Sequence, residues 1–199
     1  LAVLASLGVA FYAMSKDPYD VSGSLPTRAV AATPDLGGGI PPGEWHFYGR
    51  TQFGQRYSPL DHITVENVAN LELAWTYRTG DIRGPQDVTE TTYQVTPLKV
   101  GDTLYLCTPH NLAIALNATT GEEKWRFDAQ VGLEAARQHQ TCRGVAYHRD
   151  DGVPTGQPCA ERVYLPTADA RLIALDAANG EICAGFADGG TLDLLANMP

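Results

Sequence analysis

Two stretches of this chain repeat one another, and the repeat limits the possible folds more than any other feature. Residues Ala115–Glu122 (ALNATTGE) recur 59 residues later as Ala174–Glu181 (ALDAANGE). Each copy joins the end of an apolar run, a turn rich in Asn, Asp, Thr or Gly, and the start of the next run. Repeats of about 40–60 residues built in this way are typical of a β-propeller with one repeat per blade.

The first copy belongs to a series of four short apolar or alternating runs, each closed by turn residues. This order predicts an antiparallel meander and an all-β fold, and such a sheet needs neighbours of its own kind to bury both faces. A β-sandwich with two unrelated Asx-Gly hairpins is the alternative. The four predicted strands are Pro97–Val100, Thr103–Thr108, Leu112–Ala118 and Glu123–Asp128.

A fainter third copy of the last strand lies upstream, at Leu71–Gly80, where Trp75 takes the place of Trp125. We interpret both tryptophans as packing between neighbouring blades, because such a ring buries a large apolar surface. In the second copy Ala184 stands at the tryptophan position. The contact made by Trp125 must therefore be replaced by another one in that copy.

Length and charge restrict the chain further. It has 199 residues and a formal net charge of −9. A propeller needs at least four blades to close, and the sequence holds two complete repeats and part of a third, so we expect a fragment of a longer protein. The acidic balance and the absence of a Lys/Arg run argue against nucleic-acid binding.

The N-terminal part differs from the rest in composition. Leu1–Met14 is apolar and uncharged, but shorter than the roughly 20 residues that cross a bilayer. We favour the end of a transmembrane helix; a signal peptide and a buried core helix are the alternatives. Residues 15–43 are rich in Pro and Gly and predict a linker. The first blades of a truncated propeller are expected over 44–199, beginning with a helical turn or two at Ile63–Leu71 and a strand at Glu72–Arg78.

The run from Glu44 to Leu71 carries the pattern E-W-x3-G-R-x6-Y-S-x4-I-x3-N-V-x2-L. It resembles the N-terminal signature of the bacterial quinoproteins, the alcohol dehydrogenases that depend on pyrroloquinoline quinone (PQQ). Thr64 and Glu72 depart from that signature. The later runs TPLKVGDTLYLCTPHN, TGEEKW and HQTCRGVAYH are similar to the membrane-bound glucose, quinate and shikimate branch. The resemblance implies an eight-bladed propeller that follows transmembrane helices.

The resemblance also implies a reaction. An alcohol would be oxidised at PQQ, with Ca²⁺ polarising the quinone, a carboxylate taking the hydroxyl proton, and electrons passing to ubiquinone. The protein would lie in the bacterial inner membrane with its propeller in the periplasm. In this family the base and metal ligands come from later blades, so we assign no catalytic residue and no metal ligand here. We expect the 199 residues alone to be inactive and poorly folded.

Three residues are candidates for binding the cofactor. PQQ is a flat ortho-quinone with three carboxylates, and the planar fork of Arg143 suits a carboxylate or carbonyl pair. The resemblance places an arginine at this position beside the quinone oxygens. It likewise places His139 near the cofactor and the substrate. Gln94 stands where many relatives have a Glu that contacts the cofactor, so it keeps hydrogen-bonding groups without the charge.

The remaining chemistry-bearing residues are interpreted as structural. Four cysteines in a chain that we expect to face the periplasm permit disulfides, and we favour Cys142–Cys159 because the pair would close the polar insertion between them. No Cys or His spacing suits zinc. The adjacent-cysteine pair of methanol and ethanol quinoproteins is absent. The other histidines, which we leave as structural or exposed, are His46, His62, His110 and His148.

Two questions stay open at this point. A non-enzymatic propeller, such as an outer-membrane assembly lipoprotein, uses similar repeats, but it lacks the EWxxYGR start and has a lipobox cysteine near its N-terminus. The substrate is either glucose or quinate and shikimate. Gln94 and the run from Thr108 to Asn111 tilt the choice slightly toward the cyclic acids.

Overall fold

The computed structural model describes residues 6, 8–9, 11–12, 39–132 and 139–196. The chain divides into two units, Leu1–Pro34 and Asp35–Pro199. The described residues of the first unit are helical, and no helix in the described part of the chain is long and apolar enough to cross a membrane. The predictions for residues 1–14 and 15–43 lie mostly outside the described residues.

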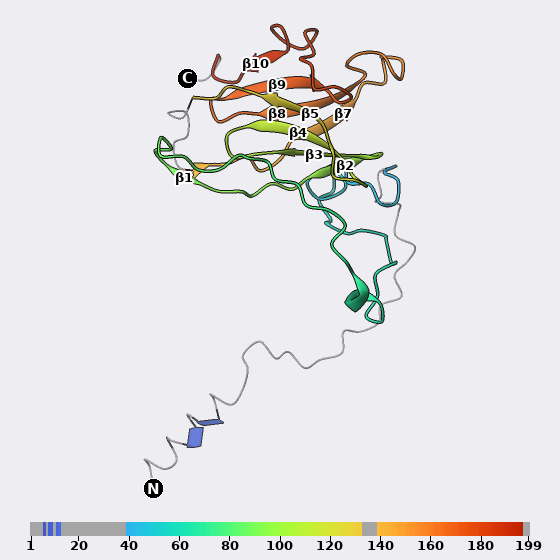
Figure 1. Ribbon diagram of the computed structural model, residues 1–199, viewed down its shortest axis with the longest axis vertical. Coiled ribbons are helices and arrows are strands. Elements are labelled where there is room, and N and C mark those ends of the chain that lie inside the picture. Colours follow the sequence, from blue (N-terminus) through green and yellow to red (C-terminus); the bar gives the residue numbers. More distant parts are fainter. Residues whose placement is uncertain (1–5, 7, 10, 13–38, 133–138, 197–199) are drawn as a thin grey trace. The chain divides into compact units, whose positions relative to one another are not determined.

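The second unit contains two four-stranded antiparallel sheets (Figure 1). The first sheet has the order β2-β3-β4-β5, and its strands follow one another along the chain. Each lies within one residue of its predicted ends, which confirms the meander. The bounds are β2 (Leu98–Val100), β3 (Thr103–Cys107), β4 (Leu112–Asn117) and β5 (Glu123–Asp128).

The second sheet repeats this arrangement with the order β7-β8-β9-β10. The turn after β4 and the turn after β9 are closed in the same way: Gly121 N donates to Asn117 O at 2.9 Å, and Gly180 N donates to Asp176 O at 2.8 Å. The repeat seen in the sequence is therefore a structural one. The bounds are β7 (Ala146–Arg149), β8 (Glu161–Pro166), β9 (Arg171–Asp176) and β10 (Thr191–Asp193).

The two sheets pack face to face around one core. Tyr105 and Trp125 of the first sheet both reach the second, where the phenol and the indole N–H each donate to Ala177 O at 3.0 Å. Burial raises the pKa of Tyr105 to about 12, so the phenol remains protonated and able to donate. Val163 and Leu175 face the first sheet from β8 and β9 and are fully buried. The sheets are thus neighbours, as the propeller prediction requires.

The opposite face of the first sheet is also covered. Leu106, Ile114 and Leu116 are buried there, and Trp75 and Tyr77 pack against them. The first sheet therefore lies between the second sheet and the segment that contains Trp75. This is the order expected for consecutive blades.

The tryptophans make the same contact twice. A Cβ atom added to Gly121 would lie 2.5 Å from Trp75, and one added to Gly180 would lie 2.6 Å from Trp125. Each indole thus rests on the turn glycine of the following sheet, at a distance that no other residue permits. The predicted packing role of both tryptophans is confirmed.

Two local predictions need correction. A 3-10 turn, η1 (Val68–Asn70), occupies the end of the predicted helical segment, but the structure has no strand at Glu72–Arg78. The backbone there has no ladder partner among the described residues. The segment is held to the first sheet by the packing of Trp75 and Tyr77 and by Arg126, which donates to the Tyr77 hydroxyl at 2.7 Å and, just beyond the segment, to Thr79 O at 3.0 Å.

The outer strand of the second sheet also differs from its counterpart. The repeat aligns Phe186 with Phe127 of β5, yet the chain pairs with β9 near Cys183, whose N–H donates to Ala174 O at 2.8 Å, and then leaves the sheet. It pairs again only at β10, opposite residues 171–173. Phe186 lies in the intervening loop and contacts the Tyr164 ring edge-on at 5.2 Å.

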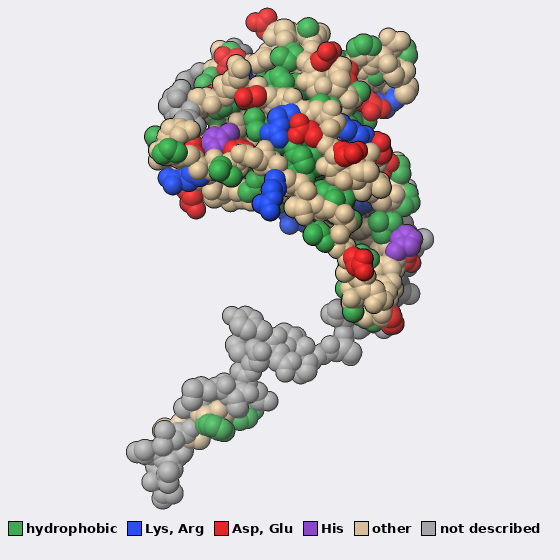
Figure 2. All heavy atoms as spheres, in the orientation of Figure 1, with side chains coloured by type: hydrophobic (Ala, Val, Ile, Leu, Met, Phe, Trp, Pro, Cys, Tyr) green, Lys and Arg blue, Asp and Glu red, His purple; other side chains and the backbone are tan. Residues whose placement is uncertain are grey.

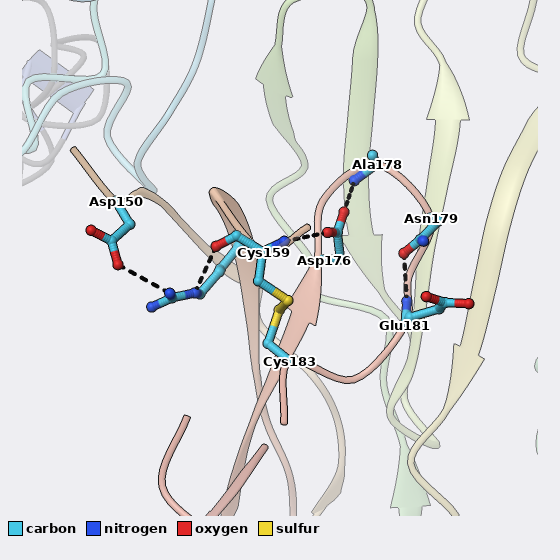
Figure 3. Close-up of a disulfide and its surroundings, with 8 residues drawn as sticks. Asp150, Cys159, Asp176, Ala178, Asn179, Glu181 and Cys183 are labelled. Carbon is cyan, nitrogen blue, oxygen red and sulfur yellow. Dashed lines mark hydrogen bonds and ion pairs between the residues drawn. A yellow bond between two sulfur atoms is a disulfide. The ribbon is translucent and has the colours of Figure 1, made fainter. Parts of the chain in front are cut away.

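The favoured disulfide Cys142–Cys159 is wrong. The bonds are Cys107–Cys142 and Cys159–Cys183. Cys107 ends β3, whereas Cys159 lies just before β8, the equivalent strand of the next sheet, so the two positions are at opposite ends of the sheets. Figure 3 shows the second disulfide, with the backbone N–H of Cys159 donating to the carboxylate of Asp176.

Candidate functional site

A short parallel strand pair organises the candidate site. β1 (Glu90–Thr91) precedes the first sheet and β6 (His139–Gln140) precedes the second, and the two pair in parallel with Glu90 opposite His139. The pairing continues beyond the strands, because Thr92 N donates to Gln140 O at 3.0 Å and Thr96 N donates to Arg143 O at 3.1 Å. Segments that are about 50 residues apart in the sequence therefore run side by side. The spacing of apolar residues along the sequence gives no indication of this pairing.

A pocket of about 490 Å³ opens beside β6. It is bounded by the segment that follows β6 and by the turns that join β3 to β4 and β8 to β9. Its lining contains amide, hydroxyl, imidazole and guanidinium groups and no carboxylate. The lining residues are Asn111, His139, Thr141, Cys142, Arg143, Pro166, Thr167 and Ala168.

The structure brings two of the three predicted site residues together. His139 and Arg143 both line this pocket. Gln94 is not among the lining residues; it is exposed on the segment between Thr92 and Thr96 that pairs with residues 140–143. The binding role of all three residues stays a prediction.

The turns that close the pocket are equivalent in the two sheets. In the first, Asn111 N donates to Thr108 O at 2.9 Å, and in the second Ala170 N donates to Thr167 O at 3.0 Å. Asn111 and Ala170 both have a left-handed backbone, with φ of 62° and 63°. The 59-residue offset of the sequence repeat also relates these two residues. Extending the repeat four residues upstream of Ala115 and Ala174 would therefore have found this turn.

Asn111 joins the two turns across the pocket. It is 1% exposed, and its side-chain oxygen accepts a hydrogen bond from Ala168 N at 3.1 Å. The amide nitrogen is left to donate toward a bound molecule. The sequence analysis missed this residue as a site candidate because an Asn in a turn is ordinarily explained by its backbone conformation.

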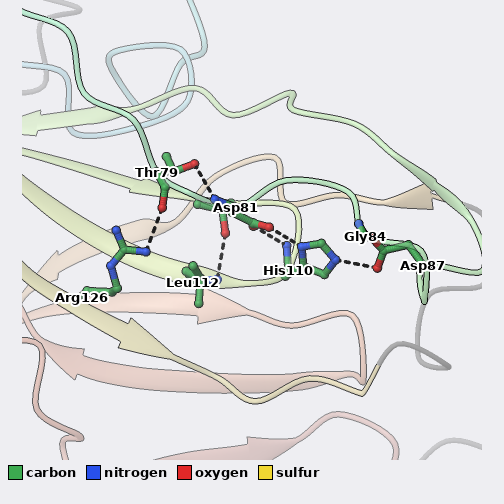
Figure 4. A network of polar contacts seen from close by, with 8 residues as sticks. Thr79, Asp81, Gly84, Asp87, His110, Leu112 and Arg126 are labelled. Atoms are coloured by element: carbon green, nitrogen blue, oxygen red, sulfur yellow. Dashed lines mark hydrogen bonds and ion pairs between the residues drawn. The ribbon is translucent and has the colours of Figure 1, made fainter.

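Two acidic features border the pocket without lining it. The imidazole Nδ1 of His139 lies 3.3 Å from a carboxylate oxygen of Glu90. Next to Asn111, the His110 ring lies between the carboxylates of Asp81 and Asp87 (Figure 4). Partial burial lowers the pKa of His110, but hydrogen bonds to Asp87 and Asp81 outweigh it and raise that pKa above its ordinary value. The hydrogen bond from His110 also lowers the pKa of Asp87.

The donor set fits PQQ. A ligand with three carboxylates and two quinone oxygens requires cationic and hydrogen-bond-donating groups around it, and Arg143, His139, Thr141 and Asn111 supply these types of group. Two buried polar atoms next to the pocket, Thr141 Oγ1 and Gln140 Nε2, also have no hydrogen-bond partner in the structure. Such atoms are normally paired in a folded protein, so their state agrees with a site that holds a further molecule.

A larger pocket at the other end of the two sheets fits PQQ less well than the pocket beside β6. It has a volume of about 720 Å³ and lies beside Tyr105 and Ala177. Its lining contains five carboxylate side chains and one lysine, which would repel a polyacid. The larger volume therefore does not make it the better candidate. The charged residues that line it are Glu44, Asp102, Lys124, Glu161, Asp176 and Glu181.

Neither the surface charge nor the metal-ligating side chains of the described residues indicate a further candidate site. Figure 2 shows acidic and basic side chains interspersed over the visible face of the sheets, without a continuous basic surface there. Within the described ranges, no group of three or more His, Cys, Asp or Glu side chains is placed to hold a metal ion.

Comparison with known proteins places the chain among quinoproteins. Residues 45–199 match the family model described as the glucose/ethanol/alcohol dehydrogenase β-propeller domain of PQQ proteins. The quinoprotein glucose dehydrogenase of Escherichia coli is 45% identical over the whole chain, and that of Gluconobacter oxydans is 40% identical. The quinate/shikimate dehydrogenase (quinone) of Acinetobacter baylyi is 37% identical over 75% of the chain.

Solved structures agree with the fold. Quinohemoprotein alcohol dehydrogenase from Comamonas testosteroni matches 82% of this chain with a TM-score of 0.63 and 27% identity. The aligned part is 21% of that longer chain. The chain spans about a quarter of the length of the two glucose dehydrogenases, 25% and 26%. From the family match over 45–199 and the identity over the whole length, the chain belongs to the PQQ-dependent quinoprotein dehydrogenase family and forms part of its β-propeller domain.

Proposed function

We propose that the intact protein is a PQQ-dependent dehydrogenase that oxidises a hydroxyl group of a sugar of the glucose class. The observation that carries the proposal is the donor-lined pocket formed by residues that the family match covers. When bound, PQQ supplies the two-electron acceptor for an alcohol. In this role Arg143 binds a carboxylate or quinone oxygen, and His139 orients a hydroxyl of the substrate.

The substrate assignment rests on the comparisons. The glucose dehydrogenases of E. coli and G. oxydans align with the entire chain, at 45% and 40% identity. The quinate dehydrogenases align with 75% and 80% of it, at 37% and 34%. This difference outweighs the slight tilt toward cyclic acids that Gln94 gave. Quinate or shikimate is the second candidate.

We further propose that the protein acts at the bacterial inner membrane, with the propeller in the periplasm and ubiquinone as electron acceptor. Two disulfides support an oxidising compartment, because such bonds seldom persist in the cytosol. The expected eight blades, the Ca²⁺ ion and its ligands belong to the same proposal.

An assay of the intact gene product in membranes tests these points. The apoprotein is reconstituted with PQQ and Ca²⁺, and glucose and quinate are compared in parallel with an artificial acceptor and with ubiquinone reduction. We expect glucose oxidation that depends on PQQ and is lost after chelation of the metal. Faster turnover of quinate would replace the sugar assignment, and activity with neither substrate in the presence of bound PQQ would overturn both.

A further inference from the structure

The position of Arg143 depends on its backbone. Among the described residues, its guanidinium makes no hydrogen bond or ion pair. The segment that carries it pairs with residues 90–96 through a two-residue parallel ladder and a few further hydrogen bonds. A ladder of this length is weak alone.

The Cys107–Cys142 disulfide gives this segment its firm attachment. Cys107 ends β3 in the middle of the first sheet and is fully buried, and Cys142, which is 4% exposed, immediately precedes Arg143. Cys142 also lines the pocket. The bond therefore joins the wall that carries His139 and Arg143 to the rigid sheet beneath it.

We propose that the Cys107–Cys142 disulfide is a positioning element for the cofactor site, holding Arg143 and His139 at the distance from Asn111 that the bound quinone requires. The inference rests on the proposed function, because it concerns the site for PQQ. Without the bond, the backbone at Arg143 samples more positions, and ordering it again weakens binding.

The second disulfide offers a matched control. Cys159–Cys183 closes a similar separation in sequence, 24 residues against 35. It lies before β8, where Arg162 donates to Cys159 O at 2.9 Å and pairs with Asp150 (Figure 3). None of these residues lines the candidate pocket. Loss of either bond should lower stability, but only loss of the first should affect the site.

The test compares two double variants of the intact protein, Cys107→Ala/Cys142→Ala and Cys159→Ala/Cys183→Ala. PQQ affinity of the apoprotein is measured by isothermal titration calorimetry, and unfolding temperature is measured separately. We expect about a tenfold or larger increase in Kd for the first variant and less than about a twofold change for the second, with both unfolding at lower temperature. Equal Kd values in the two variants would overturn the inference.

A double-mutant cycle separates positioning from general loosening. If the disulfide acts through Arg143, then Arg143→Ala weakens PQQ binding much less in the Cys107→Ala/Cys142→Ala background than in the wild type. If the losses of binding free energy caused by Arg143→Ala and by removal of the disulfide are additive, the disulfide does not act through Arg143. If the wild-type protein itself binds no PQQ, the proposed function fails and not this inference alone.

Native-state reduction covers the case in which the first variant does not fold. In folded Cys159→Ala/Cys183→Ala protein, a phosphine reductant can cleave only Cys107–Cys142 among the disulfides of the described residues. Because a phosphine also reacts with a quinone, the apoprotein is reduced, its thiols are alkylated and checked by mass spectrometry, and the reductant is removed before titration with PQQ; a raised Kd supports the proposal. An unchanged Kd after complete reduction contradicts it.

Discussion

Gly180 shows how the absence of one side chain sets the distance between neighbouring sheets. Its backbone has φ +75°, and its Cα faces the indole of Trp125 so closely that a methyl group would overlap the ring. Gly121 stands in the same relation to Trp75. Each of these two glycines fixes how closely a whole sheet approaches the preceding tryptophan, because a buried indole cannot move aside without breaking its packing.

Gly180→Ala should therefore destabilise the protein through both backbone strain and overlap. The left-handed backbone costs about 1–2 kcal/mol for Ala, and overpacking adds about 1–3 kcal/mol. Gly156→Ala is the control, since Gly156 has φ +80° but no atom within 4 Å of the added methyl. Urea unfolding should show a clearly larger loss for Gly180→Ala; equal losses would mean that the indole contact is unimportant.

Asn111→Asp tests the charge requirement of the pocket. The substitution keeps the size and the oxygen that accepts from Ala168 N, but adds a negative charge facing a polyacid. We expect PQQ affinity to fall about tenfold or more, measured by titration of the apoprotein. Asn117→Asp is the control, because the equivalent residue in the second sheet is already Asp176. Unchanged affinity in Asn111→Asp would place the cofactor elsewhere.

At the scale of elements, the segment 81–87 is held on the β3–β4 turn by His110 (Figure 4). Asp81 also accepts from His110 N at 2.9 Å, and Gly84 N donates to Asp87. The carboxylates of Asp81 and Asp87 are almost fully buried, with 4% and 3% of the side chain exposed, so the contacts with the His110 ring offset the cost of burying them. The sequence analysis interpreted His110 as structural or exposed, and the structure agrees with the structural role.

The His110 contact predicts how stability changes with pH. A raised pKa means that its stabilisation is present below the unfolded value, about 6.5, and is lost as pH rises through the higher folded value. The lowered pKa of Asp87 acts in the opposite sense, and its contribution is lost only as pH falls below about 4. Unfolding followed from pH 5 to 8 should thus show a decline that His110→Gln removes.

His148→Gln is the matched control for this experiment, because His148 is exposed on β7. Its pH profile should follow that of the wild type. A wild-type profile that is flat between pH 6 and 8, or one that is the same in His110→Gln, would show that the contact with Asp81 and Asp87 does not stabilise the fold.

At the scale of the whole molecule, exposed apolar residues gather at and around β10, the edge strand of the second sheet. Ile182, Leu192, Leu194 and Leu195 are 41–51% exposed there. Large apolar groups at an exposed strand edge favour association with another chain. This chain spans about a quarter of the length of the two glucose dehydrogenases, and we propose that further blades of the intact protein cover this surface.

We accordingly predict that the 199 residues, expressed alone, associate and do not oxidise glucose or quinate with added PQQ. Size-exclusion chromatography and a dye-linked assay check the two parts. Replacing Leu192 and Leu194 by Lys should reduce the association without restoring activity. A monomeric, active preparation of the 199 residues would contradict the expectation that later blades supply the catalytic base.

The strands and their order in the first sheet could be predicted from local patterns in the sequence. Alternating runs such as Thr103–Cys107 and turn residues such as Gly121 act over a few positions, so periodicity reveals them. The outer strand of the second sheet could not be predicted in this way, because the chain pairs with β9 at Cys183, leaves the sheet, and pairs again only from Thr191. Resemblance suggested His139 and Arg143, but it did not suggest Asn111.

The residues themselves were sufficient for the all-β meander, the stacking of two like sheets and the contact of each tryptophan with the next sheet, since these depend on short-range patterns repeated along the chain. The pairing of β1 with β6, the partners of the four cysteines and the closure of the pocket by Asn111 emerged only from the folded chain. Those contacts join positions 24 to 57 residues apart, and distances of that kind are set by how the sheets stack.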